Sequence, residues 1–166
     1  FSVGISIGHR HADLVLIDFV GKVQFHATLP RPTSDPGSNH SEFLKTIRDA
    51  VSLLPQPARQ RLAGVGLALP HTDSIAIDEE AYYKALQDEI EVDLGMPVFV
   101  QNDITAAASG ESMFGAAKPL SDYMFFYLGA KLHGRLVINH QIHHGNSPVT
   151  FDVGIGALEH ALKKKK

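Results

Sequence analysis

Histidine is the residue type with the clearest potential for chemistry, with 10 copies in 166 residues. His140, His143 and His144 lie close together, and Asp152 follows nearby. Imidazole and carboxylate side chains are ligands that zinc and similar transition metals accept. The three histidines lack the i, i+4 spacing of a ligand pair on a helix. We therefore expect a polar hairpin and the loop after it here, rather than a metal site.

The pair Asn102-Asp103 is a second candidate, because it follows an apolar run and precedes an alanine-rich segment. Asn and Asp are preferred residues at helix N-caps, where each contributes about 1 kcal/mol. A helix cap and a ligand-facing carboxylate can be the same residue. The position therefore leaves a structural role and a binding role open.

The elements that position these residues are predicted from hydrophobic periodicity. Strands are predicted at 2–7, 12–20, 23–29, 62–69, 97–100, 122–128 and 136–139, with a hairpin turn at His140-Gln141. Helices are predicted from Ser41 up to Pro55, from Asp78 to about Leu94, and from Asn102 or Asp103 to Gly115. A meander of three strands followed by alternating strands and helices predicts an α/β fold, in which a mixed sheet has helices on both faces.

The composition excludes several classes of protein. Cysteine is absent, which excludes a disulfide scaffold, Cys-ligated zinc, an iron–sulfur cluster and a thiol nucleophile. Acidic residues outnumber basic ones by 18 to 15, and four of the basic residues are Lys163–Lys166, so direct contact with DNA is not expected. No stretch approaches the ~20 apolar residues that span a bilayer, and no signal peptide opens the chain. These features predict a cytoplasmic protein without a membrane partner.

In the segment 94–116, LGMPVFVQNDITAAASGESMFGA, a strand ends in Asn-Asp before a small-residue helix. This segment is the most specific of several that resemble the ROK family of sugar kinases and repressors. The strand LAGVGLALPH at 62–71 and the hairpin DFVGKV at 18–23 are also similar to the family pattern, as are 127–129 and 137–139. The resemblance implies the ribonuclease H-like, actin-like ATPase fold.

In ROK kinases two glycine-rich loops hold the phosphates of ATP, because backbone N–H groups must approach the phosphates closely. The family's D-I-G-G-T-K loop corresponds to 6–11, where Gly8 is kept and His9 and Arg10 stand at the next two positions. The G-T-G-I-G-G-G loop corresponds to 129–135, where Gly129 and Gly134 are kept and Lys131, His133 and Arg135 replace glycines. These replacements predict that ATP is not bound and that no cofactor is needed.

The same replacements suggest a basic patch if the two loops face each other. It would consist of His9, Arg10, Lys131, His133 and Arg135, and it could accept an anion such as a phosphosugar. A solvated rim is the simpler expectation, because charged side chains are mostly exposed.

The sugar side of the family site matches better. The resemblance implies that Asn102 hydrogen-bonds sugar hydroxyls and that Asp103 corresponds to the base of the kinases. Asp152 corresponds to a further carboxylate in the family's A-G-E-I-G-H stretch, although Phe151 and Ile155 depart from that pattern. The family's cysteine-rich zinc segment is missing from this chain.

These features together predict a non-catalytic, sugar-sensing domain of a ROK-type transcriptional regulator. Its DNA contact would come from an N-terminal domain absent from this chain, which begins without Met, and we expect a homodimer or tetramer. We expect an N-terminal lobe over 1–118 and part of a second lobe over 119–166. A divergent sugar kinase that uses Asp103, and a pure oligomerisation module, are the alternatives.

Overall fold

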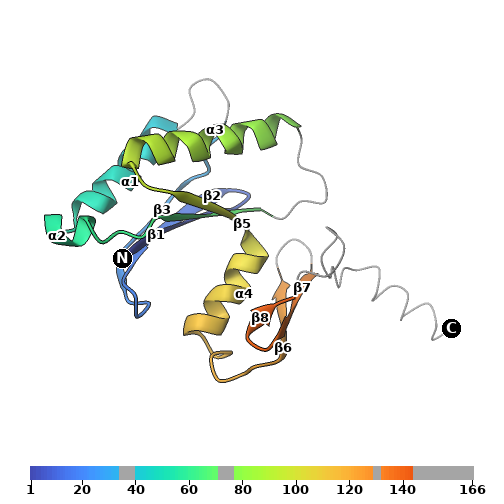
Figure 1. Cartoon of the computed structure of the whole chain (residues 1–166). Helices are drawn as coiled ribbons and strands as arrows, with labels where there is room; N and C mark the ends of the chain where they lie inside the picture. Colours follow the sequence, from blue (N-terminus) through green and yellow to red (C-terminus); the bar gives the residue numbers. More distant parts are fainter. Residues whose placement is uncertain (34–39, 71–76, 129–131, 144–166) are drawn as a thin grey trace. The chain divides into compact units, whose positions relative to one another are not determined.

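A computed structural model describes residues 1–33, 40–70, 77–128 and 132–143 of the chain. The chain divides into two compact units, Phe1–Asp103 and Ile104–Lys166, and each is considered separately (Figure 1). The compact units meet between residues 103 and 104. The lobes expected over 1–118 and 119–166 stay a prediction. Among the described residues, no helix is long and apolar enough to cross a membrane.

The first unit is built on a five-stranded mixed sheet with the order β3-β2-β1-β4-β5. Strands β1 (Ser2–Ile7), β2 (His11–Ile17) and β3 (Val23–Pro30) form an antiparallel meander, while β4 (Val65–Leu69) and β5 (Val98–Asn102) run parallel to β1. Parallel neighbours need long crossover connections, which helices provide. Helix α1 (His40–Ser52) and the short α2 (Gln56–Arg59) precede β4, and α3 (Ile77–Leu94) connects β4 to β5.

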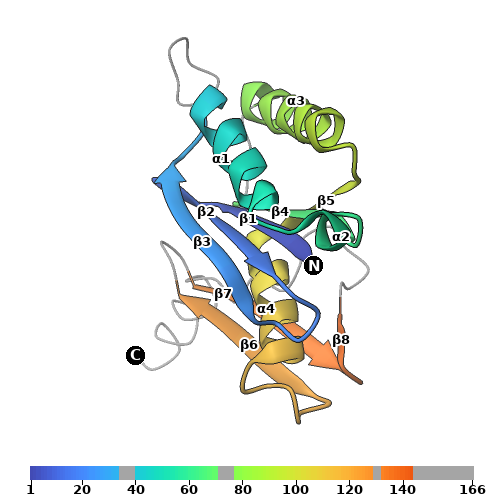
Figure 2. The same ribbon diagram turned by 90° about the vertical axis from the view of Figure 1, so that its left-hand side faces the viewer.

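The hydrophobic core lies on one face of this sheet. Val3, Ile5 and Ile7 alternate along β1 and are at most 2% exposed. Register places Leu16, Leu14 and Ala12 of β2 opposite them, and Val65 and Leu67 of β4 continue the same layer. Phe43 and Ile47 of α1 and Leu86 and Ile90 of α3 belong to the same cluster of buried residues. Figures 1 and 2 show both helices side by side on this face of the sheet.

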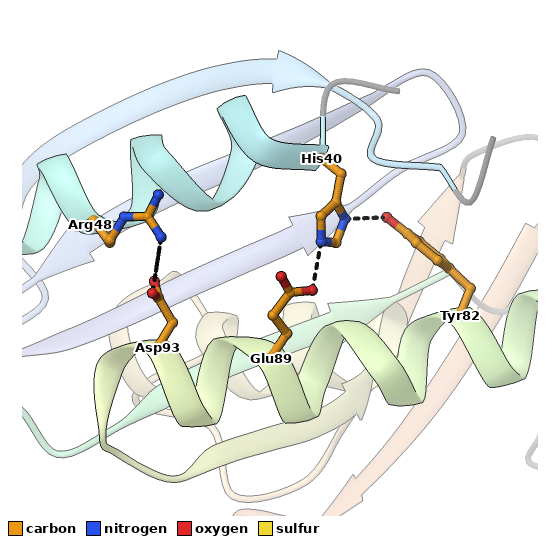
Figure 3. Close-up of polar contacts among 5 residues, drawn as sticks. All are labelled: His40, Arg48, Tyr82, Glu89 and Asp93. Atoms are coloured by element: carbon orange, nitrogen blue, oxygen red, sulfur yellow. Dashed lines mark hydrogen bonds and ion pairs between the residues drawn. The ribbon is translucent and has the colours of Figure 1, made fainter. Parts of the chain in front are cut away.

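Polar contacts join α1 to α3 along their exposed sides (Figure 3). The His40 Nε2 atom lies 2.7 Å from Glu89 Oε2, and His40 Nδ1 lies 3.2 Å from the Tyr82 hydroxyl. Further along α1, Arg48 Nη1 donates to both carboxylate oxygens of Asp93, at 2.9 and 3.0 Å. The two helices are therefore held by apolar packing beneath and by hydrogen bonds and the Arg48–Asp93 ion pair above.

The second unit contains α4 (Asp103–Phe114), whose first residue belongs to the first unit, and the antiparallel sheet β6 (Tyr123–Leu128), β7 (Leu132–Ile138) and β8 (Gln141–Ile142). Helix and sheet are connected by the Tyr123 hydroxyl, which donates to the Ala108 carbonyl at 3.4 Å, and by Arg135 Nε, which donates to Thr105 Oγ1 at 2.9 Å. At the end of α4 the Glu111 side chain turns back, and its Oε1 accepts the Ala116 N–H at 2.6 Å.

Several predicted boundaries were wrong. Helices α1 and α3 begin at His40 and Ile77, so Ser41 and Asp78 are second residues of their helices rather than caps. The sequence did not predict α2. Pro57 lies in the first turn of this helix, which tolerates proline because the N–H that proline lacks is unpaired at that position anyway. The hairpin turn lies at Asn139-His140, whose φ angles of 53° and 60° suit a type I′ turn.

We predict that Gly64→Ala destabilises the first unit while Gly66→Ala does not. Gly64 has a φ of +148°, and a Cβ there would lie 2.8 Å from the Pro97 carbonyl oxygen. The Cβ of an alanine at position 66 would lie 3.9 Å from its nearest neighbour, the Val3 carbonyl oxygen. Urea unfolding should show a loss of about 1–3 kcal/mol for Gly64→Ala and at most about 0.5 kcal/mol for the control. Equal losses would contradict this packing.

We further predict that Tyr82 makes the protein sensitive to alkali. Burial, with smaller contributions from Tyr83 and Glu89, raises the pKa of Tyr82 from 10.0 to about 12. The folded state therefore holds the hydroxyl proton more tightly than the unfolded state does. This stabilisation is complete below pH 10 and is lost as the pH rises towards 12. Tyr82→Phe should flatten the fall of the melting temperature over that range, and an unchanged slope would contradict the assignment.

Candidate functional site

The candidate residues that belong to the first unit lie at one edge of its sheet. Strands β1, β4 and β5 are parallel, and register pairs Ser6 with Ala68 and Leu69 with Asn102. Their carboxyl ends therefore lie together. Ligands of α/β proteins commonly bind outside the carboxyl ends of parallel strands. This edge is the candidate functional site.

Asn102 and Asp103 lie at the junction of β5 and α4. Asn102 is the last residue of β5 and Asp103 is the first residue of α4, and both are half-buried. The backbone N–H of Asn102 donates to Gln101 Oε1 at 2.8 Å. The partial positive charge at the start of a helix favours a carboxylate such as that of Asp103. The pair can thus offer an amide, which both donates and accepts, beside an acceptor held at a helix start.

The predicted first phosphate loop is a tight hairpin turn at the same edge. The Gly8 N–H donates to the His11 carbonyl at 2.8 Å, so the chain reverses through His9 and Arg10. Both of these side chains are exposed. The Arg31 N–H donates to the Arg10 carbonyl at 3.2 Å, which joins the turn to the end of β3. Gly8 therefore has its N–H occupied within the hairpin.

The predicted second phosphate loop contains more strand than expected. Gly129 and Lys131 lie outside the described residues, but β7 begins at Leu132, four positions before the predicted start at Leu136. His133 and Gly134 are therefore strand residues. His133 is 7% exposed and Arg135 is 2% exposed, so neither forms a solvated rim. The Arg135 guanidinium also donates to the Gly134 carbonyl at 2.8 Å, which helps to satisfy a buried charge.

Arg31 is a polar residue at this edge that sequence reasoning missed. It directly follows β3, whose last residue, Pro30, is paired with His11. Its Nη2 atom lies 2.6 Å from both Glu79 Oε1 and the Tyr83 hydroxyl, while within the described residues its Nε–H has no partner. Burial alone would lower the pKa of Arg31, but Tyr83 and Glu79 outweigh it and raise the pKa. The cluster connects the end of β3 to the first turns of α3.

Asp13 is the centre of a second cluster, on β2 and β3. Thr28 Oγ1 donates to Asp13 Oδ1 at 2.6 Å, and the Nε2 atoms of His26 and His11 lie 3.3 and 3.4 Å from its carboxylate oxygens. The Thr28 hydrogen bond is the largest cause of a lowered pKa of Asp13, and both histidines add to it. The register of β2 and β3 brings these residues together, so no local sequence pattern pointed to the cluster.

The predicted histidine cluster is only partly described. His140 lies in the β7–β8 turn and its N–H donates to the Ser121 carbonyl at 2.8 Å, while the His143 N–H donates to the Leu136 carbonyl at 2.8 Å. His144 and Asp152 lie outside the described residues. Within the part of the chain that is described, no group of three or more His, Cys, Asp or Glu residues could hold a metal ion.

The sequence of this chain is similar to that of a known protein family. A sequence model of the ROK family matches residues 2–161. The chain belongs to the ROK family. Its fold is accordingly the actin-like ATPase fold that the sequence predicted, and the mixed sheet agrees with it.

ROK relatives of two kinds are similar to this chain. The xylose repressor of Bacillus subtilis (strain 168) is 23% identical over 160 residues, which are 93% of this chain and 41% of the relative. The glucokinase of Streptomyces coelicolor is 25% identical over 162 residues, covering 92% of this chain and 48% of the relative.

Among solved structures, a ROK family transcriptional regulator described as a homologue of the E. coli MLC protein superposes with a TM-score of 0.64 at 20% identity. That superposition covers 92% of this chain and 39% of the regulator. The chain thus spans less than half of the length of these ROK proteins.

We predict that the Asp13 cluster stabilises this ROK chain at neutral pH and loses this effect in acid. Because the folded state lowers the pKa of Asp13 below 3.8, its contribution is complete above pH 3.8 and is lost as the pH falls further. Asp13→Asn should therefore lower the melting temperature at pH 7 and have progressively less effect below pH 3.8. Asp49→Asn, an exposed change on α1, is the control. A difference that stays constant from pH 7 to pH 3 would contradict the prediction.

Proposed function

We propose that this chain is the sugar-sensing part of a ROK-family transcriptional regulator and that it does not phosphorylate its ligand. The observation that carries the proposal is the hairpin turn at Gly8–His11, whose glycine N–H is paired and whose next two positions carry large exposed side chains. Such a regulator would contact DNA through another domain, and we expect a homodimer or tetramer. A cytoplasmic location fits such a regulator.

ATP binding needs a cradle of backbone groups around the phosphates. Several backbone N–H groups must converge on the anion with no side chain in the way. At the β1–β2 turn the Gly8 N–H is used by the hairpin, and His9 and Arg10 stand where the family pattern has glycine and threonine. At the other predicted loop, His133 and Gly134 belong to a strand. In the described residues of these two segments, 6–11 and 132–135, the chain forms a hairpin turn and a strand.

Side chains that can bind hydroxyl groups support a sugar as the ligand. Asn102 and Asp103 together supply donors and acceptors at the carboxyl edge, and both are only half-buried. Asp152 would add a further acceptor, although it lies outside the described residues. The names of the two relatives, a xylose repressor and a glucokinase, indicate a pentose or a hexose as the ligand class.

Sensing would operate by a shift of population between two arrangements of the protein. A ligand can favour one arrangement only if it binds that arrangement more tightly. In this proposal Asn102 hydrogen-bonds sugar hydroxyls and Asp103 accepts a hydrogen bond from one of them. No cofactor takes part.

A divergent sugar kinase is the second candidate function. It is favoured by Asp103, which matches the position of the base in ROK kinases, and by the similarity to the glucokinase. In that case Asp103 would accept the proton of the attacking sugar hydroxyl, and ATP would have to be held by groups other than the two degenerate loops.

The two candidates differ in whether the 166-residue chain hydrolyses ATP in the presence of a sugar. We expect xylose, glucose or another simple sugar of a panel to raise its stability by about 2.7 kcal/mol at a hundred times the dissociation constant, with no ATP hydrolysis. Asp103→Asn should raise the sugar concentration needed for this stabilisation at least tenfold, while Asp49→Asn should leave that concentration unchanged.

Sugar-dependent ATP turnover that Asp103→Asn abolishes would establish the kinase and refute the proposed regulator. A chain that no sugar stabilises would instead favour a pure oligomerisation module.

A further inference from the structure

Strand β3 is an edge strand that lacks most of the features that keep edges from pairing. The five-stranded sheet has the order β3-β2-β1-β4-β5, so one edge of β3 pairs with β2, and the other has no strand partner among the described residues. Its eight residues, VQFHATLP, include no Lys, Arg, Asp or Glu. Natural edge strands are commonly protected by such charges, especially Lys, or are very short. The outer edge of β3 is therefore suited to pairing with another strand.

The hydrogen bonds to β2 show which backbone groups of β3 point outward. The Arg31 N–H donates to the Arg10 carbonyl, which marks this as a hydrogen-bonded pair of the β2–β3 ladder. Hydrogen-bonded and non-hydrogen-bonded pairs alternate along an antiparallel ladder. Thr28 and His26 therefore fall in non-hydrogen-bonded pairs, and their N–H and C=O groups point to the open edge. Pro30 also faces this edge, where its missing N–H costs no bond to β2.

The side chains of β3 are self-complementary when the strand is paired antiparallel with a copy of itself. If Ala27 lies opposite Ala27 of a second copy, Phe25 lies opposite Leu29 and His26 lies opposite Thr28. The outward N–H groups of His26 and Thr28 then each meet a carbonyl of the other strand. Phe25 and Leu29 are half-buried against the core of their own chain. Cross-strand apolar pairs stabilise a sheet, and this pairing would cover the remaining exposed area of both side chains.

The irregular positions of β3 fit the same register. A β-bulge between β2 and β3 makes Gln24 an extra residue in the ladder. With Ala27 at the centre, Pro30 of one copy lies opposite Gln24 of the other, so the two positions that interrupt a ladder coincide at its ends. A register with His26 opposite itself would instead place Phe25 opposite Ala27, a large side chain against a small one. The Ala27 register is therefore the one that the strand favours.

The tip of the β2–β3 hairpin is a rigid apolar projection next to this edge. Phe19, Val20 and Val23 are 75%, 82% and 54% exposed. The turn is held by Asp18, whose Oδ1 accepts the N–H groups of Val20 and Lys22 at 3.0 and 2.9 Å. A preorganised projection loses little conformational entropy when it binds. Because antiparallel strands run in opposite directions, the tip of one copy would lie beside the end of β3 in the other.

We propose that two copies of this chain pair through β3, antiparallel about a two-fold axis at Ala27, and so form one continuous sheet. A two-fold contact uses the same surface on both copies and closes the assembly. The proposed regulator is expected to be a homodimer or tetramer, and this inference, which deepens that proposal, names its interface. The hairpin tip of each copy lies beside Arg31 of the other, at the carboxyl edge that holds the candidate site.

Amide hydrogen exchange of the unmodified chain, resolved by residue with NMR, provides the first test. The N–H groups of His26 and Thr28 gain hydrogen bonds only in the dimer. Those of Ala27 and Leu29 are bonded to β2 in either state and serve as internal controls. As the protein concentration rises and light scattering changes from one chain to two, exchange at His26 and Thr28 should slow at least tenfold. Exchange at Ala27 and Leu29 should be slow at every concentration.

A single cysteine at the proposed axis tests the register. The chain contains no cysteine, so one introduced thiol can form a disulfide only with that of another copy. In this register Ala27 forms a non-hydrogen-bonded pair with its copy, and the two Cα atoms are about 4.5 Å apart, within reach of a disulfide. Ala27→Cys should therefore give a covalent dimer under mild oxidation. Val92→Cys, at a side chain on α3 that is 84% exposed, should not.

Matched surface variants test the contact of the hairpin tip. Phe19→Lys should weaken the dimer at least tenfold, because it brings a positive charge beside Arg31 of the other copy. Val92→Lys should leave the affinity unchanged. Both positions are exposed, so both variants should keep the circular dichroism and melting temperature of the monomer, which checks folding independently. Equal affinities of the two variants would overturn the placement of the tip.

Two further results would overturn the proposal. One is a chain that stays monomeric at millimolar concentration, with exchange at His26 and Thr28 that does not change with concentration. The other is a dimer that Ala27→Cys does not cross-link, which would place the contact on another surface. Stabilisation by a sugar is measured separately on the same chain. A failure of this interface can therefore be distinguished from a failure of the proposed sensing function.

Discussion

The parallel pairing of β1 with β4 and of β4 with β5 is the constraint on which the rest of the first unit depends. Parallel neighbours require crossovers, and the crossovers here are α1 with α2 and then α3. Because both long crossover helices lie on one face, a single layer of buried side chains joins helices and sheet. The same pairing brings the ends of three strands to one edge. Folding and the placement of Asn102 therefore follow from one set of backbone hydrogen bonds.

Much of this arrangement could be predicted from the sequence, because apolar periodicity is a local property. Strand β1 has the predicted bounds, and α1 and α3 differ from the predicted helices by a residue or so at their starts. The start of β7 was missed because GAKLHGR is rich in glycine and charge, which is typical of a loop. Its strand character depends on antiparallel pairing with β6, which places Leu132 opposite Leu128 and Val137 opposite Tyr123.

The candidate site was predictable to a smaller extent. Asn102 and Asp103 were found through their resemblance to a family pattern and their position between a strand and a helix. Arg31 gave no such signal, because Glu79 and Tyr83 lie 48 and 52 residues away in the chain. Asp13 was missed because Thr28 reaches it only through the register of β2 and β3. Contacts of this kind depend on the fold and have no local pattern.

The return of Glu111 onto the end of α4 has a consequence for how this segment can change. Any side chain at Gly115 would meet the Glu111 carboxyl group, which occupies the space where a Cβ would be. A larger residue at position 115 would displace that carboxylate and leave the Ala116 N–H without its acceptor. A substitution at Gly115 therefore acts through Glu111, since it moves that carboxylate and releases the exposed Ala116 N–H, so the two positions are coupled.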